Sequence, residues 1–376
     1  MTHAPSFRPL PGHAGRRLAL AALALVAAVA LAAALAPSRA AAAAPPRGFM
    51  GISAWDDISD AQFKQLGDNN VRLYRMLVDW CNVQPRPTAR YYWTEYDRVF
   101  VRAARRGVRI MPLLECSPKW AAAETTFQPR TEAGRRAFDA FAAAAARRYG
   151  PNGLIWSRAP WSKASPAPAS VRAYYWQVWN EPNTPPNWNP GPRPGEYAQM
   201  LKRVSRALKG ASPSVRVLSA GLPWPAQGMN PEPFLSNMLK VSGLLSAVDV
   251  FAVHPYGQLP FHVMQRVSSA RRTLNARGAS AKSMWITEVG WATGRYDGWW
   301  TVSPSQQASN LDTFYRQLLA YRKSYKILGG TWFSFQDHIP KPGVQDYWGF
   351  RSGLLYADGR AKPSWRVFVK RAKSGY

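Results

Sequence analysis

Residues 174–223 read YYWQVWNEPNTPPNWNPGPRPGEYAQMLKRVSRALKGASPSVRVLSAGLP, and this stretch contains one complete unit of the fold. Its two ends, 174–182 and 215–223, are short apolar runs rich in β-branched and aromatic residues, which is typical of buried strands. Between them, residues 195–210 carry apolar side chains at helical spacing and end in a glycine. A strand, a helix and a second strand in this order predict a parallel β–α–β unit.

The same alternation recurs along the chain from residue 48 onward. The pattern predicts six further strands and several more helices; the strands are 48–54, 71–80, 108–116, 248–256, 284–291 and 329–337, and the helices include 92–107, 131–150 and 306–325. No G-x-G-x-x-G follows the first strand, which disfavours an open dinucleotide-binding sheet. We therefore predict a single-domain α/β protein, a (β/α)8 or TIM barrel, over residues 45–376.

Two local features accompany this prediction. The helix at 306–325 is preceded by a capping signature, with Ser303 as N-cap, Pro304 at the first helical position and Gln306 three residues after the serine. The Pro/Ser/Ala stretch at about 159–170 resembles a linker, but the eight strands require both of its flanks. We expect it to be a long loop before the fourth strand.

The first 44 residues are typical of an export signal. Residues 1–17 contain no acid and end in Arg16-Arg17, residues 18–36 are apolar throughout, and an alanine run reaches Ala44. A positive segment, an apolar segment and small residues in this order predict a signal peptide, cleaved between Ala40 and Ala44, and a secreted, extracellular protein. The alternative is an uncleaved membrane anchor, because the apolar segment approaches the ~20 residues of a membrane span.

Composition narrows the function classes. A formal net charge of +28 could attract an acidic glycan, a nucleic acid or a membrane surface, or could belong to a solvated arginine-rich surface. No Lys/Arg run interleaved with aromatics and no nucleic-acid motif occurs, so we expect no nucleic-acid partner. With 2 Cys and 5 His, of which His3 and His13 precede the apolar segment, a four-ligand zinc site is disfavoured, and we expect neither metal nor cofactor.

Two glutamates stand where strands end. Glu181 closes the fourth predicted strand within Trp179-Asn180-Glu181-Pro182-Asn183, and Glu288 closes the seventh within Thr287-Glu288-Val289-Gly290-Trp291. In a barrel, the carboxyl ends of these two strands face each other across the mouth. A pair of carboxylates across a cleft is what glycosidic bond cleavage requires, because one protonates the leaving oxygen and the other attacks the anomeric carbon or activates water.

These motifs resemble glycoside hydrolase clan A, and most of all its families thirty-nine and five. The resemblance extends over roughly residues 48 to 370 and includes Ser117-Pro118-Lys119-Trp120 after strand three and His254-Pro255-Tyr256 after strand six. It implies a retaining glycosidase with Glu181 as general acid/base and Glu288 as nucleophile. The charge of Glu288 would then favour the protonated form of Glu181 until Glu288 is esterified. A carbohydrate, as polysaccharide or glycoside, is the implied substrate.

The resemblance also implies roles for residues around the pair. Asn180 would hydrogen-bond the sugar 2-hydroxyl, Tyr256 would contact Glu288, and His254 would line the cleft near Glu181. Arg72, at the start of strand two, would lie beneath Glu288 and favour its charged form. Each of these side chains, Arg72 included, could instead be a structural residue of the barrel interior.

Tryptophans in loops and at strand ends are candidate sugar platforms, because flat indole rings stack on the C–H faces of pyranose rings. Among the 17 Trp, Trp332 on strand eight is implied by the resemblance, and Trp120 and Trp291 follow strands three and seven. Trp188, Trp299 and Trp300 are further candidates. The alternative for all of them is core packing.

Two cysteines and one further acid complete the set. Cys81 and Cys116 follow adjacent parallel strands, so in an exported protein they could form a disulfide or remain as two buried thiols. Glu115 stands near a position where family five usually has a histidine, and this departure favours family thirty-nine. Glu115 is either a substrate contact or a solvated strand-end charge, and we favour the second.

Two other functions remain open on sequence grounds. A transglycosylase that remodels a cell-surface polysaccharide would use the same residues and differ only in the acceptor. A non-catalytic carbohydrate-binding barrel would be favoured by loss of either glutamate, and both are present. An esterase of the Ser-His-Asp type is disfavoured because no G-x-S-x-G occurs at a strand–helix turn.

Overall fold

The computed structural model describes residues 45–54, 58–294, 301–340 and 346–374. The predicted signal segment, residues 1–44, lies outside these ranges, as do Trp299 and Trp300. Within the described part of the chain, no helix is both long and apolar enough to cross a membrane.

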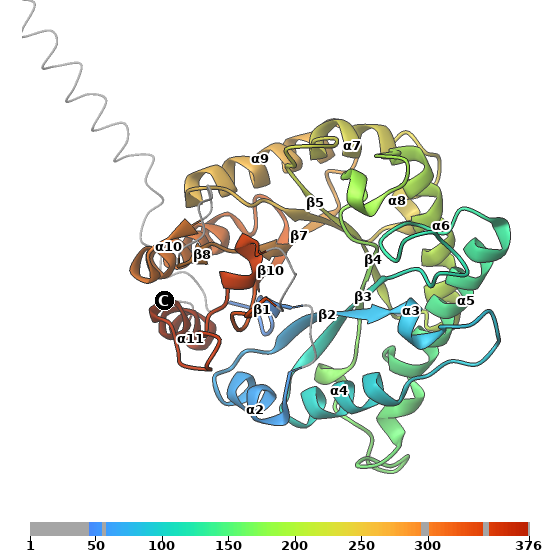
Figure 1. Ribbon diagram of the computed structural model, residues 1–376, viewed down its shortest axis with the longest axis horizontal. Helices are drawn as coiled ribbons and strands as arrows, with labels where there is room; N and C mark the ends of the chain where they lie inside the picture. The colour runs from blue at the N-terminus through green and yellow to red at the C-terminus, as the bar shows by residue number, and fades with distance from the viewer. Residues whose placement is uncertain (1–44, 55–57, 295–300, 341–345, 375–376) are drawn as a thin grey trace, which may run out of the picture. The chain divides into compact units, whose positions relative to one another are not determined.

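Eight parallel strands close into a barrel, as the sequence predicts (Figure 1). Every predicted strand is present, and each is shorter than the run predicted for it by one to five residues. The strands are β1 Met50–Ser53, β2 Leu73–Asp79, β3 Arg109–Glu115, β4 Tyr175–Val178, β5 Arg216–Pro223, β6 Val250–His254, β7 Ser283–Val289 and β10 Ile327–Phe333. Strand β10 pairs with both β7 and β1, which closes the ring.

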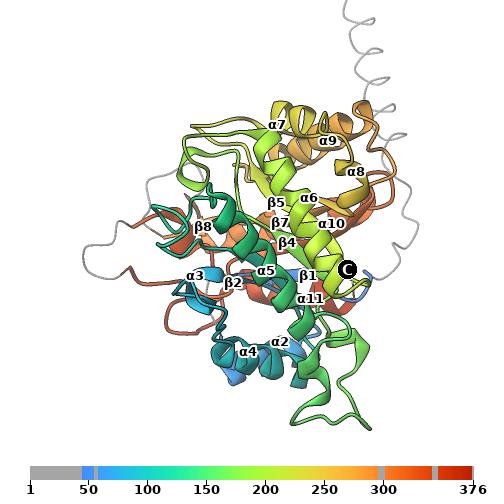
Figure 2. The ribbon, with the colours of Figure 1, turned by 90° about the vertical axis from the view of Figure 1, so that its right-hand side faces the viewer.

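Helices between successive strands cover the outside of the barrel (Figures 1 and 2). The predicted helices correspond to α4 Thr94–Arg105, α5 Glu132–Tyr149, α6 Pro194–Ala211 and α10 Pro304–Tyr321. The other helices are α2 Asp60–Asp68, α3 Trp80–Val83, α7 Pro231–Met238, α8 Leu244–Ala247, α9 Pro260–Ala276 and α11 Pro363–Ser374. The predicted cap of α10 is confirmed, because the Ser303 hydroxyl accepts a hydrogen bond from the backbone N–H of Gln306 at 3.1 Å.

The stretch between α5 and β4 is a long loop. It contains only two single turns of 3-10 helix, Leu154–Ser157 and Ala169–Val171, which confirms the prediction for this part of the chain. A small parallel sheet, β8 Ala292–Thr293 with β9 Thr301–Val302, lies beyond the end of β7. Two further turns of 3-10 helix, Pro185–Asn187 and Trp348–Arg351, follow β4 and β10.

The inside of the barrel is divided into an apolar and a polar half. Near the strand starts, five buried side chains pack together in a cluster of their own: Leu73, Met111, Leu218, Val250 and Trp285. Near the strand ends, the inward positions are polar and include Ser53, Arg75 and Gln177. A polar layer at the carboxyl end of the strands is where barrel enzymes place their chemistry.

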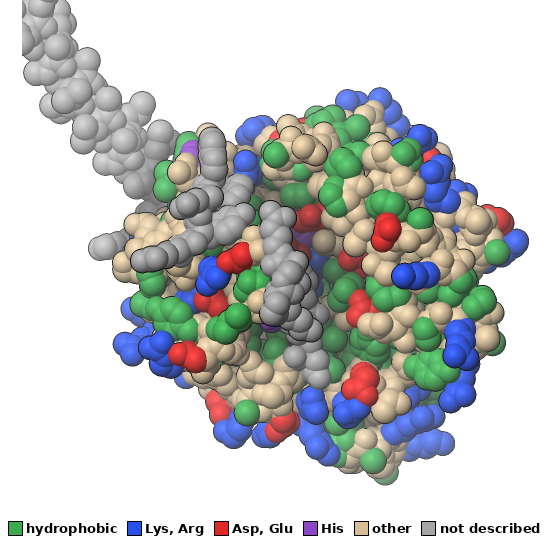
Figure 3. Space-filling view, in the orientation of Figure 1, with side chains coloured by type: hydrophobic (Ala, Val, Ile, Leu, Met, Phe, Trp, Pro, Cys, Tyr) green, Lys and Arg blue, Asp and Glu red, His purple; other side chains and the backbone are tan. Residues whose placement is uncertain are grey.

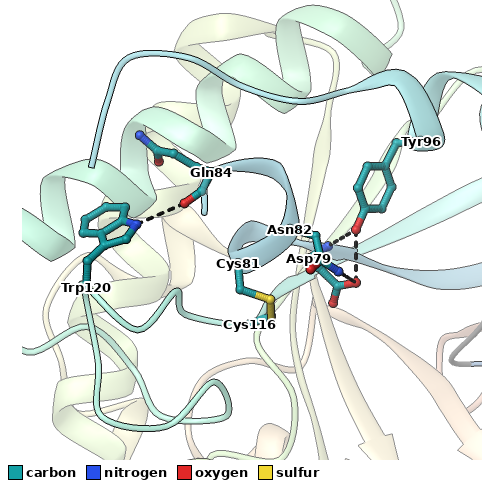
Figure 4. Close-up of a disulfide and its surroundings, with 7 residues drawn as sticks. All are labelled: Asp79, Cys81, Asn82, Gln84, Tyr96, Cys116 and Trp120. Atoms are coloured by element: carbon teal, nitrogen blue, oxygen red, sulfur yellow. Dashed lines mark hydrogen bonds between the residues drawn. A yellow bond between two sulfur atoms is a disulfide. The ribbon is translucent and has the colours of Figure 1, made fainter. Parts of the chain in front are cut away.

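A disulfide joins the ends of β2 and β3 (Figure 4). Cys81 and Cys116 are bonded with their Cα atoms 5.3 Å apart, and the backbone N–H of Cys81 donates to the carbonyl of Cys116 at 2.7 Å. The neighbouring register pairs Asp79 with Glu115, so the two strands finish side by side, as the barrel prediction requires. The disulfide links the two loops that follow β2 and β3. The alternative of two buried thiols is therefore wrong.

Candidate active site

Glu181 and Glu288 meet at the mouth of the barrel. A carboxylate oxygen of each and a ring nitrogen of His254 all lie within 4.8 Å of one another. Glu288 lies near the end of β7, and Glu181 follows β4 after two residues. Figure 3 looks onto this end of the barrel and shows Asp and Glu side chains around a central hollow, with most Lys and Arg toward the periphery.

Glu288 is buried and held from two sides. Arg75 Nη1 donates to Oε1 at 2.7 Å, and the Tyr256 hydroxyl donates to Oε2 at 2.7 Å. Its exposed fraction is only 8%. Burial by itself would raise the pKa of Glu288, but His254 and Arg75, together with the hydrogen bonds from Tyr256 and Arg75, lower it below the ordinary value. Glu288 is therefore ionised and fixed in orientation at neutral pH.

Arg75 connects several parts of the site. Besides Glu288, its guanidinium donates to Gln177 at 2.5 Å, to Ser53 at 2.7 Å and to the Asn180 side-chain oxygen at 3.0 Å. These partners come from β1, β4 and the segment after β4, and Glu288 lies on β7, so one buried cation holds the ends of three strands in place. The predicted contact of Tyr256 with Glu288 is present, and Asn180 lies beside the pair as expected.

Glu181 is the more accessible of the two glutamates. Its side chain is 23% exposed, and Oε1 lies 2.8 Å from Nδ1 of His254. The other ring nitrogen of His254 lies 3.0 Å from the Thr287 hydroxyl. His254 thus stands between the two glutamate-bearing segments, near Glu181 as predicted.

The backbone at Glu181 is unusual. Trp179 and Glu181 have φ values of 69° and 46°, which lie in the left-handed region that non-glycine residues rarely adopt. Such conformations cluster at active sites, where the surrounding structure holds them. Gly221 on β5 makes room for this arrangement, because a Cβ atom there would overlap the imidazole of His254, and its carbonyl accepts the N–H of Glu181 at 3.2 Å.

The predicted role of Arg72 is wrong. Strand β2 begins one residue later, and the Arg72 guanidinium donates to Asn70 and to the Arg106 carbonyl near the strand starts. Arg75 takes the position beneath Glu288 instead. Three residues along a strand correspond to ~10 Å and reverse the side-chain face, so the two arginines reach opposite ends of the barrel. Arg75 could have been singled out in the sequence, because it is the one cation within the largely apolar strand LYRMLVD.

Trp332 and Trp291 are core residues, which corrects their prediction as sugar platforms. Both are 0% exposed, their rings lie 5.8 Å apart, and their indole N–H groups donate to the carbonyls of Ser352 and Gln258. Trp332 is in register with Val289, which follows Glu288 on β7. Side chains alternate between the two faces of a strand, and Glu288 faces into the barrel. Val289 and Trp332 therefore face outward, toward the helices. Trp188 is also buried.

Trp120 is half-buried and stays a candidate. Its indole N–H donates to the Gln84 carbonyl at 3.1 Å (Figure 4), and its ring packs edge-on against Trp80 at 5.2 Å.

Other aromatic residues line the site and escaped prediction. Phe333 is in register with Ser53, which contacts Arg75, so it faces inward where Trp332 does not. Trp348 lies 4.7 Å from the Tyr256 ring and 6.0 Å from Phe333, and it is only half-buried. Burial raises the pKa of Tyr347, and the nearby charges of Glu288 and Glu181 raise it further. Its segment follows β10 and carries no sequence pattern beyond its aromatic content.

Glu115 is buried at the end of β3, which corrects the expectation of a solvated charge. Burial, with further contributions from the charges of Glu181, Asp79 and Glu288, raises the pKa of Glu115 well above its ordinary value despite Arg75. A carboxyl group in this setting keeps its proton to higher pH and can donate as well as accept a hydrogen bond. Glu115 is a third carboxyl group in the cleft, and its chemistry differs from that of Glu288.

The protonated state of Glu115 leads us to predict different kinetic effects for two substitutions of this residue. Because glutamine has the same shape and is always neutral, Glu115→Gln should leave kcat within about threefold, whereas Glu115→Ala removes the polar group and should raise KM by ~10-fold, the value of one hydrogen bond. Steady-state kinetics on the three proteins checks this. A loss of kcat in Glu115→Gln as large as that in a Glu181 variant would contradict it.

The contact of Arg75 with Glu288 leads us to predict a change in the pH dependence of kcat/KM when Arg75 is replaced. Removing its charge in Arg75→Gln should raise the pKa of Glu288, so the acid limb of kcat/KM should move to higher pH. The sign follows because Arg75 lowers the pKa of Glu288 in the folded protein, and a carboxylate that acts as a nucleophile must be ionised. Arg72→Gln is the matched control, since Arg72 lies at the other end of the barrel. Equal pH profiles for wild type and Arg75→Gln would contradict the assignment.

The same three side chains, Glu181, His254 and Glu288, could be read as ligands of a metal ion. The geometry disfavours it, because Arg75 already places a positive charge 2.7 Å from Glu288 and would repel a cation there. Among the residues that the structure describes, a second group of ligand-type side chains contains Cys81 and Cys116, whose sulfurs are bonded to each other.

The fold is similar to those of several glycoside hydrolases of known structure. The described fold is similar to a family 39 glycoside hydrolase from Bacteroides cellulosilyticus WH2, with 22% identity, a TM-score of 0.63, and coverage of 86% of this chain and 63% of that chain. A family 39 β-xylosidase from Caulobacter crescentus matches at 23% identity and a TM-score of 0.62, over 88% of this chain and 72% of that one. Xylanase 10B from Thermotoga maritima matches at 14% identity and a TM-score of 0.56, over 87% and 95%.

The chain spans 63% of the length of the first of these structures. No curated protein sequence matches the chain. The family model described as glycosyl hydrolase catalytic core matches residues 155–350, a segment that includes both Glu181 and Glu288. The chain therefore belongs to the glycosyl hydrolase catalytic core family, in agreement with its resemblance to the clan A glycosidases.

Proposed function

We propose that this protein is a retaining glycoside hydrolase in which Glu288 is the nucleophile and Glu181 the general acid/base. The observation that carries the proposal is the approach of their carboxylate oxygens to within 4.8 Å. Retaining enzymes place the two carboxyl groups ~5 Å apart, whereas inverting enzymes leave ~6.5–9.5 Å for a water molecule. The close approach supports direct attack by Glu288.

The first step forms a covalent intermediate. An oxygen of ionised Glu288 bonds to the anomeric carbon while the glycosidic C–O bond breaks, and Glu181 gives its proton to the leaving oxygen. Arg75 and Tyr256 hold Glu288 in its charged, oriented form beforehand. Because Arg75 binds the side-chain oxygen of Asn180, the amide NH2 of Asn180 is the group that can contact the sugar 2-hydroxyl.

The second step reverses the roles. Once Glu288 is an ester, its negative charge is gone, and Glu181, now ionised, takes a proton from water as the water oxygen attacks the anomeric carbon. The ester bond breaks and Glu288 regains its charge. His254, 2.8 Å from Glu181, keeps that carboxylate aimed at the same point in both steps.

We also propose that the protein is exported. The charge and hydropathy pattern of residues 1–44 supports a cleaved signal, and the Cys81–Cys116 disulfide is consistent with an oxidising compartment. Mass spectrometry of protein from the culture medium should find a chain whose first residue lies between Ala41 and Pro45. Recovery of the full-length chain in the membrane fraction would favour the anchor instead.

Release of reducing ends from a panel of plant, fungal and bacterial glycans tests the hydrolase proposal. Wild type should cut at least one glycan, and Glu288→Gln should not. Glu124→Gln, an isosteric change of an exposed glutamate, is the matched control and should retain wild-type activity. If wild type binds a glycan but cuts none, the barrel is a carbohydrate-binding protein and the proposal fails.

A further inference from the structure

A cavity opens at the opposite end of the barrel from the glutamates. It has a volume of about 210 Å³ and is lined by residues at or before the strand starts, among them Arg47, Arg72, Arg109, Tyr175 and Trp285. Its inner wall is apolar, since Leu73 and Trp285 belong to the buried cluster that fills this half of the barrel. Its rim carries three arginines.

The three guanidinium groups converge. A Cβ atom placed on Gly107 would lie 2.8 Å from Nη1 of Arg72 and 3.6 Å from Nη2 of Arg47, so these two nitrogens are separated by no more than the sum of those distances. Arg109 is close enough that the charge of Arg47 lowers its pKa, in addition to the larger effect of burial. The pKa of Arg72 is lowered by the same two causes.

Within the described part of the chain, no carboxylate forms an ion pair with any of these three arginines. Arg47 donates to the Gly107 carbonyl, Arg72 to Asn70 and the Arg106 carbonyl, and Arg109 to the Ser170 carbonyl, and every one of these acceptors is neutral. Asp68 attracts Arg72 through space without a hydrogen bond to it, and the Asp68 carboxylate is paired with Lys64 at 2.6 Å.

The helix dipole of α4 explains the bonds of Arg47 and Arg72 to backbone carbonyls, but it leaves most N–H donors of the two guanidinium groups without a partner among the residues that the structure describes. The Arg106 and Gly107 carbonyls lie just beyond the end of α4, where the helix dipole favours cations. That attraction accounts for one N–H of Arg47 and one of Arg72, yet each guanidinium has five N–H donors. In addition, the indole N–H of Trp285 is buried without a hydrogen-bond partner in the described structure, although Trp285 lines the same cavity.

We propose that this cavity binds a phosphate-type oxyanion through Arg47, Arg72 and Arg109. Guanidinium forks bind phosphoryl oxygens through pairs of parallel hydrogen bonds, and a doubly charged anion would relieve the mutual repulsion of three arginines. The apolar inner wall accommodates a small carbon substituent on the phosphoryl group. A free phosphate ester, a phosphorylated polymer and a phospholipid headgroup share this chemistry.

The site is tested by thermal unfolding in phosphate against chloride at matched ionic strength, using the full chain. Phosphate should raise the Tm of wild type by about 2–4 °C once its concentration exceeds Kd several-fold. Arg47→Gln and Arg109→Gln should lose this shift. Arg47 is exposed, so its variant should fold normally even if Arg109→Gln does not.

Arg277→Gln is the matched control, because Arg277 is exposed where α9 ends, at the same end of the barrel, and does not line the cavity. It should keep the full shift. No shift in wild type, or an equal loss in Arg277→Gln, would overturn the proposal.

Co-sedimentation with vesicles identifies the source of the anion. Anionic phosphatidylglycerol vesicles that retain wild type more strongly than Arg47→Gln would identify a lipid headgroup, because the N-terminal segment is the same in both proteins. Equal retention, with the phosphate shift present, would identify a soluble phosphoryl ligand.

Discussion

Replacing Glu288 by glutamine should lower kcat by on the order of 10⁴-fold or more, as in other enzymes that lose a covalent nucleophile. The substitution preserves shape but leaves no negative charge to attack the anomeric carbon. It also leaves the buried Arg75, which lies 2.7 Å from Glu288, without its ionic partner, so some loss of stability accompanies it. Substrate affinity should change far less than kcat.

Two measurements separate chemistry from folding in this variant. Steady-state kinetics gives kcat and KM, and circular dichroism with thermal unfolding reports whether the barrel is intact. Glu288→Asp retains the charge but withdraws it by one methylene, so it should be impaired yet remain measurably active. A folded Glu288→Gln protein with kcat near that of wild type would exclude Glu288 as the nucleophile.

Under the proposed mechanism Glu181 is the proton donor, so Glu181→Ala should lower kcat by ~10²–10⁴-fold, the usual contribution of general acid/base catalysis. The loss should depend on the leaving group. A substrate that releases a stabilised phenolate needs no proton for the first step, so the glycosyl ester should form and accumulate as a burst. An added anionic nucleophile such as azide, which needs no base, should then restore turnover.

The pH profile gives an independent check on Glu181. General acid catalysis gives the pH profile of kcat/KM an alkaline limb, and under the proposed mechanism this limb should vanish in Glu181→Ala with an activated substrate. Glu124→Ala serves as the control, because Glu124 is an exposed glutamate in a loop. If azide does not accelerate Glu181→Ala and the alkaline limb persists, proton transfer belongs to another residue, and Glu115 would be the first to examine.

The fold was predictable because the barrel depends on a pattern that repeats eight times. Each strand is an apolar run of β-branched and aromatic residues, and each error in its boundaries is small compared with the number of repeats. Glu181, Glu288, His254 and Tyr256 could be located for a related reason. They lie at or just after strand ends, where a residue's place in the sequence fixes its place on the barrel mouth.

Two of the errors concern residues whose role depends on the phase of a strand. Arg72 and Arg75 occur in the same predicted strand, and only the true start of β2 at Leu73 decides which one lies under Glu288. The same applies to Trp332, which alternation places outside the barrel while Phe333 faces in. Glu115 was misjudged because its burial comes from segments distant in sequence, which no local pattern records.

The stereochemistry of the first product tests the central claim most directly. Proton NMR during the earliest turnover resolves the anomeric proton before the sugar has mutarotated. Double displacement through Glu288 predicts that the new hemiacetal has the same anomeric configuration as the bond that was cut. A first product of inverted configuration would contradict the account, because it would mean that water, and not Glu288, attacks the sugar.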